Sequence, residues 1–219
     1  MKAVLFDLDG TLLDTRDMIL ESFKYAYTTV IGEDCLPTDA EILSLVGIPL
    51  ITQMELINPD KSKELFEAYL ANNATISDSM LRSFEGTEAA LARLVEQGFR
   101  LAVVTSKRHG SALHGLECTG IDGYFEFLIG ADDVAEHKPK PGPLLEAAKR
   151  MELPVSECTY MGDSPYDMAA ARSAEMYAIG ALWGIFSETE LVEAGAELLL
   201  ADISELPDTL RDFGAATPG

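Results

Sequence analysis

Two aspartates near the start of the chain have a spacing that suits nucleophilic and acid–base chemistry. Asp7 and Asp9 lie in the string DLDGT, at the end of a mostly apolar run at residues 2–7. If that run is a β-strand, side chains two positions apart point the same way, so both carboxylates would face one site. One could attack phosphorus while the other transfers protons. Gly10 would let the chain turn sharply, which would leave backbone N–H groups facing an anion. An Asp-Gly pair also occurs in ordinary turns, but the full string DLDGTLLDT makes chance a poor explanation.

Two further segments carry groups that could hold a phosphoryl group. Thr105 and Ser106 follow an apolar run at 100–105, and a hydroxyl together with a backbone N–H can bind phosphoryl oxygens. Taken alone, this pair is better explained as the start of a helix. Lys138 precedes Pro139, so its ammonium would be held on a stiffened segment. There it could neutralise a nucleophile and a transferring phosphoryl group.

A second acidic pair suggests a metal site. Asp163 ends an apolar run, and Asp167 follows four residues later in a helix that Pro165 opens. Hard carboxylate oxygens favour Mg²⁺, although both residues could instead complement a helix dipole, Asp167 especially. Together with Asp7 and Asp9 they place four carboxylates around one lysine. Such a cluster would repel phosphate unless a divalent cation balanced it.

Strands and helices alternate along most of the chain, which predicts an α/β fold. Nearly continuous apolar runs indicate strands buried on both faces, as in a parallel sheet. They stand at 2–7, 100–105, 125–130, 159–163 and 176–182, with a candidate edge strand at 197–203. Amphipathic segments of helical period lie between them, at 87–98, 141–151 and 164–176. We expect a Rossmann-like doubly wound parallel sheet with the polar motifs at its carboxyl edge.

The stretch from residue 15 to residue 80 departs from this alternation. It has several helical patterns and no convincing strand. We therefore predict an all-α cap domain at 15–80, inserted into an α/β core domain formed by 1–14 and 81–219. The two crossings, Leu13–Thr15 and Met80–Phe84, would serve as hinges for cap motion.

Composition excludes several classes of partner. The 219 residues carry a net charge of −21, which disfavours nucleic acid and anionic membranes. There is no membrane-spanning apolar run and no signal-peptide pattern. Cys35, Cys118 and Cys158 are widely separated and odd in number, so semi-buried free thiols in a reducing cytoplasm are expected. The oligomeric state cannot be read from the sequence.

The motifs, in this order and spacing, resemble those of the haloacid dehalogenase superfamily. The resemblance runs essentially end to end and rests on DLDGT, on the Thr105-Ser106 segment, on the Lys138 motif and on GDSPYD. The helical insert and VGIPL (46–50) resemble the cap of the phosphoglycolate phosphatase-like branch. The segments TSKRHGSALHGL and GDSPYDMAAARSAEMYAIGALWG also resemble the cytosolic pyrophosphatases of that branch.

This resemblance implies a role for each motif residue. Asp7 would be the nucleophile and form an aspartyl-phosphate, and Asp9 would be the general acid and base. Lys138 would stabilise the charge of the phosphoryl group. Mg²⁺ would be held by Asp7, the backbone carbonyl of Asp9 and Asp163, and Asp167 would support that ligation, directly or through water. Phosphate would be bound by Gly10, Thr11, Thr105 and Ser106.

The substrate is less sharply indicated than the chemistry. The loop around Gly47 would face the site, while Lys107 and Arg108 could contact a carboxylate or a second phosphate, or could be solvated surface charges. A small phosphate monoester, with phosphoglycolate as reference, is the first expectation, and inorganic pyrophosphate is the alternative. A sugar phosphomutase would need a cap rich in polar groups, and 48–57 is too apolar for that. Intact Asp7, Asp9, Lys138 and Asp163 argue against a module that only binds phosphoproteins.

Overall fold

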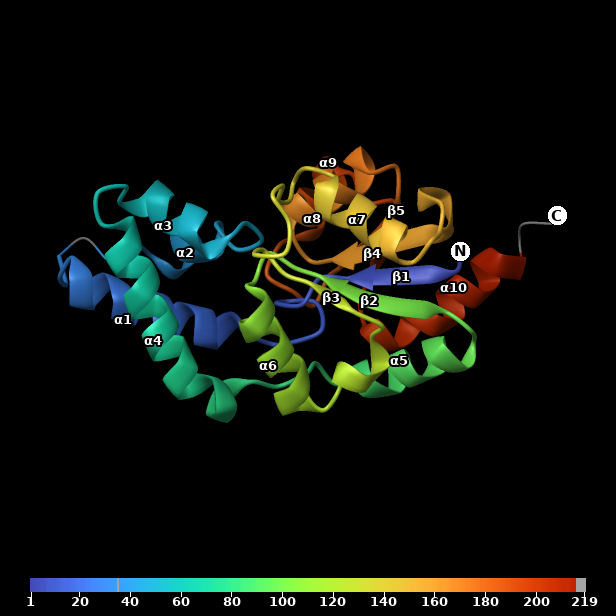
Figure 1. Ribbon diagram of the computed structural model, residues 1–219, viewed down its shortest axis with the longest axis horizontal. Coiled ribbons are helices and arrows are strands. Elements are labelled where there is room, and N and C mark those ends of the chain that lie inside the picture. Colours follow the sequence, from blue (N-terminus) through green and yellow to red (C-terminus); the bar gives the residue numbers. More distant parts are fainter. Residues whose placement is uncertain (35, 216–219) are drawn as a thin grey trace.

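The computed structural model describes residues 1–34 and 36–215, and these contain a single parallel six-stranded sheet of order β3-β2-β1-β4-β5-β6 (Figure 1). The strands are β1 (Ala3–Phe6), β2 (Arg100–Val104), β3 (Leu128–Ile129), β4 (Cys158–Gly162), β5 (Tyr177–Ala181) and β6 (Leu198–Leu200). This confirms the predicted Rossmann-like α/β fold. The run at 125–130 forms a shorter strand than expected, and a 3-10 turn, η1 (Asp122–Tyr124), lies just before the run.

The central strand shows why continuous apolar runs were informative. Every residue of β1 is buried, and β1 pairs in parallel with β2 on one side and β4 on the other. Val4 and Phe6 contribute to one hydrophobic cluster, whereas Ala3 and Leu5 contribute to another. A strand covered on both faces needs apolar residues at successive positions, without alternation.

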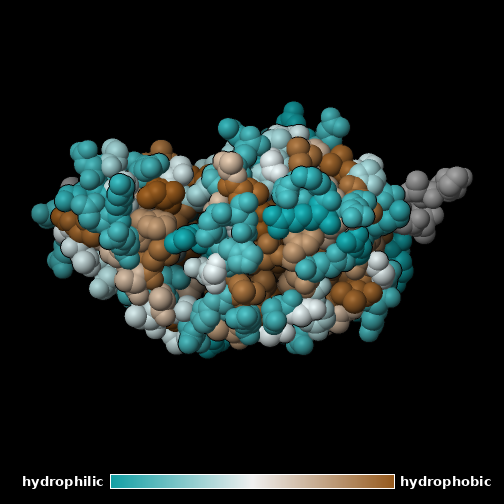
Figure 2. All heavy atoms as spheres, in the orientation of Figure 1, coloured by the Kyte–Doolittle hydropathy of each residue, from teal (hydrophilic) through white to brown (hydrophobic). Residues whose placement is uncertain are grey.

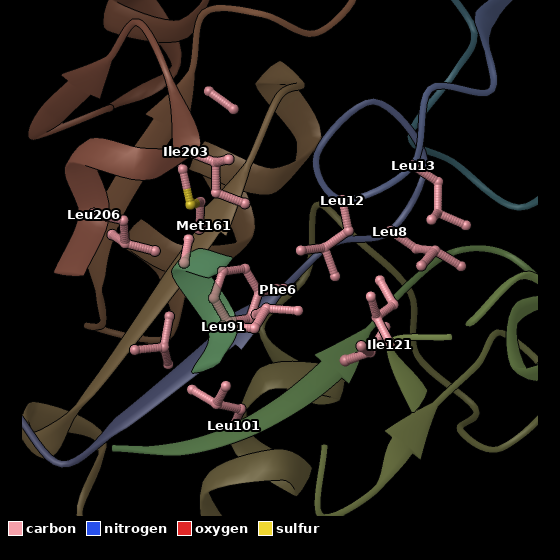
Figure 3. Close-up of a cluster of buried hydrophobic side chains, with 14 of the residues drawn as sticks. Phe6, Leu8, Leu12, Leu13, Leu91, Leu101, Ile121, Met161, Ile203 and Leu206 are labelled. Carbon is pink, nitrogen blue, oxygen red and sulfur yellow. The ribbon is translucent and has the colours of Figure 1, made fainter. Parts of the chain in front are cut away.

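Helices cover both faces of the sheet. On one face lie α5 (Thr87–Glu96), α6 (His109–Thr119) and α10 (Leu206–Ala215), and on the other α7 (Gly142–Arg150), α8 (Pro165–Ser173) and α9 (Glu188–Ala194) (Figure 1). Figure 3 shows the first of these layers, where Leu91 and Leu206 surround Phe6 and Met161 of the sheet. Two short 3-10 helices, η2 (Val155–Glu157) and η3 (Ile203–Glu205), complete the core.

The helical insert, residues 15–80, lies beside the carboxyl edge of the sheet (Figure 1). It consists of α1 (Arg16–Val30), α2 (Asp39–Leu43), α3 (Leu50–Ile57) and α4 (Ser62–Met80), and it has a hydrophobic cluster of its own around Phe23, Met54 and Leu65. Its division from the core as a separate cap domain stays a prediction.

The two crossings between insert and core lie side by side. Leu13 forms an isolated antiparallel bridge with Ser83. The Asp14 N–H donates to the Arg82 carbonyl at 2.9 Å, and the Phe84 N–H donates to the Leu12 carbonyl at 3.1 Å. These backbone contacts join the two connections to each other, and their role as hinges stays a prediction.

The described cysteines differ from the expectation of semi-buried thiols. Cys118 is exposed and Cys158 is buried, so neither is semi-buried, and both are free cysteines; Cys35 lies outside the described residues. In the part of the chain that the structure describes, no helix combines the length and apolar character needed to cross a bilayer. Hydrophilic residues spread over most of the face in Figure 2.

Candidate active site

Three buried carboxylates meet one buried lysine at the carboxyl edge of the sheet. Asp7 follows β1, Asp163 follows β4 and Asp167 lies in the first turn of α8. One ligand oxygen of each lies within 4.8 Å of the others, and we call this set the carboxylate cluster. Lys138 comes from the loop before α7 and is 3% exposed. The chain reverses its winding between β1 and β4, which is where open α/β sheets bind ligands.

Lys138 ties the cluster together. Its Nζ lies 3.0 Å from Asp7 Oδ1 and 2.6 Å from Asp167 Oδ1, and it donates to the Tyr160 hydroxyl at 3.0 Å. That hydroxyl lies 2.8 Å from the Val104 carbonyl, to which it donates. Tyr160 is thus a support of the site that sequence reasoning missed. Its signal in the sequence was a tyrosine hydroxyl inside the buried strand β4.

The cluster holds more negative charge than one lysine can balance. Burial raises the pKa of Asp7 to about 6, against the opposing effect of Lys138. Burial, with Asp167 and Asp7 nearby, raises the pKa of Asp163 well above its usual range. Burial alone would lower the pKa of Lys138, but Asp167 and Asp7 outweigh it and the pKa is raised. A divalent cation would restore the balance with the oxygen ligands it prefers, so the residues fit Mg²⁺.

Asp7 Oδ1 faces Lys138 Nζ at 3.0 Å, and this charged contact is its partner in the described residues. A buried carboxylate that meets one lysine, with Asp163 and Asp167 beside it, still lacks a full balance of charge, and oxygen ligands of this kind suit a divalent cation.

Asp167 is occupied on both oxygens, which limits what it can do. Oδ1 lies near Lys138 and the Tyr160 hydroxyl, whereas Oδ2 accepts from the Ser164 N–H at 3.0 Å and the Ser164 hydroxyl at 2.6 Å. With Ser164 it forms a capping box at the start of α8. The alternative reading of Asp167 as a helix-terminal residue thus describes part of its role, and its other part is to position Lys138.

Asp163 is held by the loops that follow β1 and β5. Its Oδ2 accepts from the Ile185 N–H at 2.8 Å, and its Oδ1 accepts from the Thr11 hydroxyl at 3.4 Å. A Cβ on Gly10 or on Gly184 would overlap the Asp163 side chain. The loop after β5 was not among the predicted site segments, because its contribution is a backbone N–H and a glycine.

Gly10 and Thr11 form the turn after β1, and their predicted part in phosphate binding stays a prediction. The Gly10 N–H donates to the Leu13 carbonyl at 2.9 Å and the Thr11 N–H donates to the Leu8 carbonyl at 3.3 Å. These two amides therefore close the turn. With its hydroxyl on Asp163, Thr11 has a supporting position, and Gly10 makes room for that carboxylate.

Thr105 and Ser106 lie at the end of β2, beside the cluster. The Thr105 Oγ1 accepts from the Lys107 N–H at 3.3 Å, and Thr105 lines the same cavity as Asp7. The Ser106 hydroxyl donates to the Gly47 carbonyl at 2.6 Å, so it joins the core to the insert. Gly47 has φ +108°, and a Cβ there would lie 2.8 Å from Ser164 Oγ. Only glycine suits this approach of the insert loop to the core.

The two basic residues after Ser106 differ in position. Lys107 Nζ lies 3.0 Å from both carboxylate oxygens of Asp9, and both side chains are largely buried. Arg108 pairs with exposed Asp132 at 3.3 Å while also lining the cavity. Lys107 is therefore inside the site, whereas Arg108 stands at its rim.

A cavity of about 70 Å³ lies between the carboxylates and the insert. Asp7, Asp9 and Thr105 form its floor, and the insert supplies the opposite wall, with apolar Ile48 and Leu50. Its polar members from the insert, none of them predicted, are Gln53, Tyr69 and Asn73. Burial, and to a lesser extent the charge of Asp9, raises the pKa of Tyr69, so it stays a neutral hydroxyl.

Comparisons with known proteins agree with this geometry. The chain matches the family described as haloacid dehalogenase-like hydrolase over residues 4–181. A protein of Caldanaerobacter subterraneus subsp. tengcongensis, named provisionally as the pyrophosphatase PpaX, is 35% identical over 204 residues, which are 93% of this chain and 92% of that protein. A hydrolase from Pseudomonas syringae has a crystal structure with TM-score 0.86 at 25% identity, covering 97% of this chain and 99% of that one. The crystal structure of a predicted phosphoglycolate phosphatase from Haemophilus somnus 129pt shares the fold, with TM-score 0.88 at 22% identity over 96% and 98% of the two chains.

Proposed function

This chain belongs to the family of haloacid dehalogenase-like hydrolases, and from that premise we propose that it is a Mg²⁺-dependent phosphatase in which Asp7 is the nucleophile. The observation that carries the proposal is the buried carboxylate cluster paired with Lys138 at the carboxyl edge of the sheet. Asp7, Asp163 and the backbone of Asp9 are the proposed holders of the ion, with Asp167 supporting them. The ion supplies positive charge that lets an anionic substrate approach these carboxylates.

The reaction proceeds in two displacements at phosphorus. A carboxylate oxygen of Asp7 attacks the phosphorus atom, and the bond from phosphorus to the leaving oxygen breaks. Asp9 donates a proton to that oxygen. Asp9 then takes a proton from water, which attacks the aspartyl-phosphate and releases phosphate with regeneration of Asp7. Lys138, fixed by Asp167 and Tyr160, stabilises the negative charge of the transferring group, and Thr105 with the Ser106 N–H orients it.

The ion pair between Lys107 and Asp9 must separate before Asp9 can act, and the substrate could cause that separation. Lys107 Nζ contacts both oxygens of Asp9 at 3.0 Å, so Asp9 cannot reach a leaving oxygen until that contact loosens. A substrate with a second anionic group offers Lys107 another partner. Binding then releases the Asp9 carboxylate, which takes up a proton from solvent and can donate it to the leaving oxygen.

Pyrophosphate is the substrate best supported by this arrangement. Its second phosphoryl group could pair with Lys107, whose Nζ lies 3.0 Å from Asp9, and Arg108 lies near at the rim of the cavity. The cavity of about 70 Å³ suits a small substrate, and a relative at 35% identity carries a pyrophosphatase name. Phosphoglycolate is the second candidate, because its carboxylate could pair with the Lys107 ammonium while its methylene carbon contacts Ile48 and Leu50.

Phosphate release from pyrophosphate and a panel of small phosphate esters tests the proposal. Turnover should require Mg²⁺, stop with EDTA, and favour pyrophosphate or phosphoglycolate over esters without a second anion. Asp7→Asn should abolish turnover, whereas Asp60→Asn, the same change at an exposed position of the insert, should not. No turnover of any ester in Mg²⁺, or an active Asp7→Asn protein, would refute the mechanism.

We also propose that the helical insert, residues 15–80, is a cap domain that closes over the cavity. The Ser106 to Gly47 hydrogen bond and the paired crossings at Leu13 and Ser83 support this role. Hydrogen exchange at residues 80–84 should slow when Mg²⁺ and a phosphate analogue are added together. Equal exchange with and without them would contradict cap closure.

A further inference from the structure

A second group of metal-ligand side chains lies outside the carboxylate cluster, where the insert meets the core. Asp78 stands in the last turn of α4, and His114 and Cys118 stand one turn apart on α6. One donor atom of each lies within 4.8 Å of the others, and all three residues are exposed. An ion could therefore enter from solvent without any movement of the core.

The distances within this group fit a zinc site. Cys118 Sγ lies 3.4 Å from His114 Nε2 and 3.8 Å from Asp78 Oδ1, and His114 Nε2 lies 2.8 Å from Asp78 Oδ1. Tetrahedral zinc with bonds of about 2.3 Å to sulfur and about 2.0 Å to nitrogen and oxygen would place its ligand atoms about 3.3–3.6 Å apart. The observed separations agree with these to within about 0.5 Å.

Each of the three side chains contacts the other two. His114 Nε2 lies nearest Asp78 and the Cys118 sulfur, and the sulfur also lies 3.7 Å from His114 Nδ1. Without a metal, hydrogen bonds to Asp78 can satisfy both the thiol and the imidazole. Because all three side chains are exposed, a small rotation of the His114 ring would turn its Nε2 lone pair toward an ion shared by the three atoms.

We propose that Asp78, His114 and Cys118 form a Zn²⁺ site that fastens the helical insert to the core. A set of one thiolate, one imidazole and one carboxylate suits Zn²⁺ better than Mg²⁺, which prefers oxygen alone. Cys118 loses its thiol proton on binding, and water takes the fourth position.

The zinc site lies where a bound ion would restrict movement of the insert relative to the core. Asp78 lies two residues from the end of α4, next to the crossing at Met80–Phe84. Asp78 and His114 also line a cavity of about 490 Å³ between α4 and α6, together with Lys107. Separation of α4 from α6 would break metal bonds, so bound Zn²⁺ holds the insert against the core. The binding part of this inference stands alone, and its effect on turnover rests on the proposed function.

Titration with Co²⁺ in saturating Mg²⁺ tests the binding. The Mg²⁺ occupies the carboxylate cluster, and only a bound thiolate gives the intense sulfur-to-cobalt absorption. We expect that band at one Co²⁺ per chain, displaced by Zn²⁺. Substitution of a residue that only hydrogen-bonds to a zinc ligand weakens metal affinity ~10–100-fold. Loss of a ligand should cost at least as much, so His114→Gln should weaken binding at least about tenfold. Cys118→Ser should abolish the band, because it removes the thiolate.

Two control variants make the result specific. His109→Gln alters another histidine of α6, which contacts the Asp133 carboxylate at 2.6 Å and, in the described part of the chain, no thiol. Cys35→Ser removes a different thiol. Both controls should keep the band. Absence of the band in the unaltered protein, or its loss in Cys35→Ser with retention in Cys118→Ser, would overturn the proposed site.

Hydrogen exchange and turnover separate the two parts of the inference. Zn²⁺ should slow exchange at residues 80–84 in the unaltered protein and leave it unchanged in Cys118→Ser. With Mg²⁺ saturating, Zn²⁺ should also lower phosphate release more in the unaltered protein than in Cys118→Ser. Binding without slower exchange would refute the fastening role. Slower exchange in a protein that hydrolyses no phosphate ester would refute only the proposed function.

Discussion

Replacement of Asp7 by asparagine should stabilise the metal-free protein, and by an amount that depends on pH. Asp7 is 4% exposed and lies near Asp163 and Asp167. Its ionised form is unfavourable there, because burial raises the pKa of its carboxyl from 3.8 to about 6. Asparagine has a similar shape and never carries that charge.

The size and sign of the effect follow from this pKa. Between about pH 4 and about pH 6 the folded protein keeps a proton on Asp7 that the unfolded chain has lost, so stability falls as pH rises through that window. The contribution is fully present below 3.8 and is lost once pH passes about 6. At about 1.4 kcal/mol per pKa unit, Asp7→Asn should gain ~3 kcal/mol over the unaltered protein by about pH 7, and almost nothing at about pH 4.

Urea unfolding in EDTA at several pH values, followed by circular dichroism, measures this difference. Saturating Mg²⁺ should reverse the order at about pH 7, since the ion binds only the folded state with its carboxylates ionised. A stability difference between the two proteins that does not change with pH would refute the argument. So would an equal effect of Mg²⁺ on both, because Asp7 would then not be a ligand.

Three other substitutions test separate features of the site. Lys138→Met leaves buried carboxylates without their cation, so turnover should fall ~10²–10³-fold. The free energy of unfolding in urea should fall by about 3–5 kcal/mol. Retention of both turnover and stability would contradict the central role of that lysine. Gly47→Ala introduces a Cβ 2.8 Å from Ser164 Oγ at φ +108°, so KM should rise about tenfold with an unchanged circular dichroism spectrum, and an unchanged KM would show that the insert loop need not dock there. Lys107→Met should lower kcat/KM for pyrophosphate by about 10–100-fold but affect p-nitrophenyl phosphate little, and equal losses on both would count against recognition of a second anion.

The candidate catalytic and metal-binding residues could be predicted from the sequence, because they lie at the ends of strands. A strand buried on both faces must be apolar at successive residues, so the runs ending near Asp7, Thr105 and Asp163 could be recognised without any knowledge of their neighbours. Parallel strands share one carboxyl edge, so the three positions were expected on that edge, and they converge because β2 and β4 flank β1. The helical insert was equally visible, since a long stretch of helical period interrupted the alternation.

The partners of those residues were decided by the tertiary structure. Thr11 donates to Asp163, which stands 152 positions away, and Lys107 contacts Asp9 across 98 positions. Neither pair belongs to a helical or strand period, so no local pattern could show that Thr11 supports a carboxylate or that Lys107 faces into the site.

The insert shows the same division between local and long-range information. Its helical period revealed that α1 and α4 exist, but not which of their polar residues would line the cavity or meet α6. Strand ends and helix faces follow from spacing along the chain, since side-chain direction is set by the backbone period. Contacts between elements depend on how the layers pack, and they are determined only when the whole chain has folded.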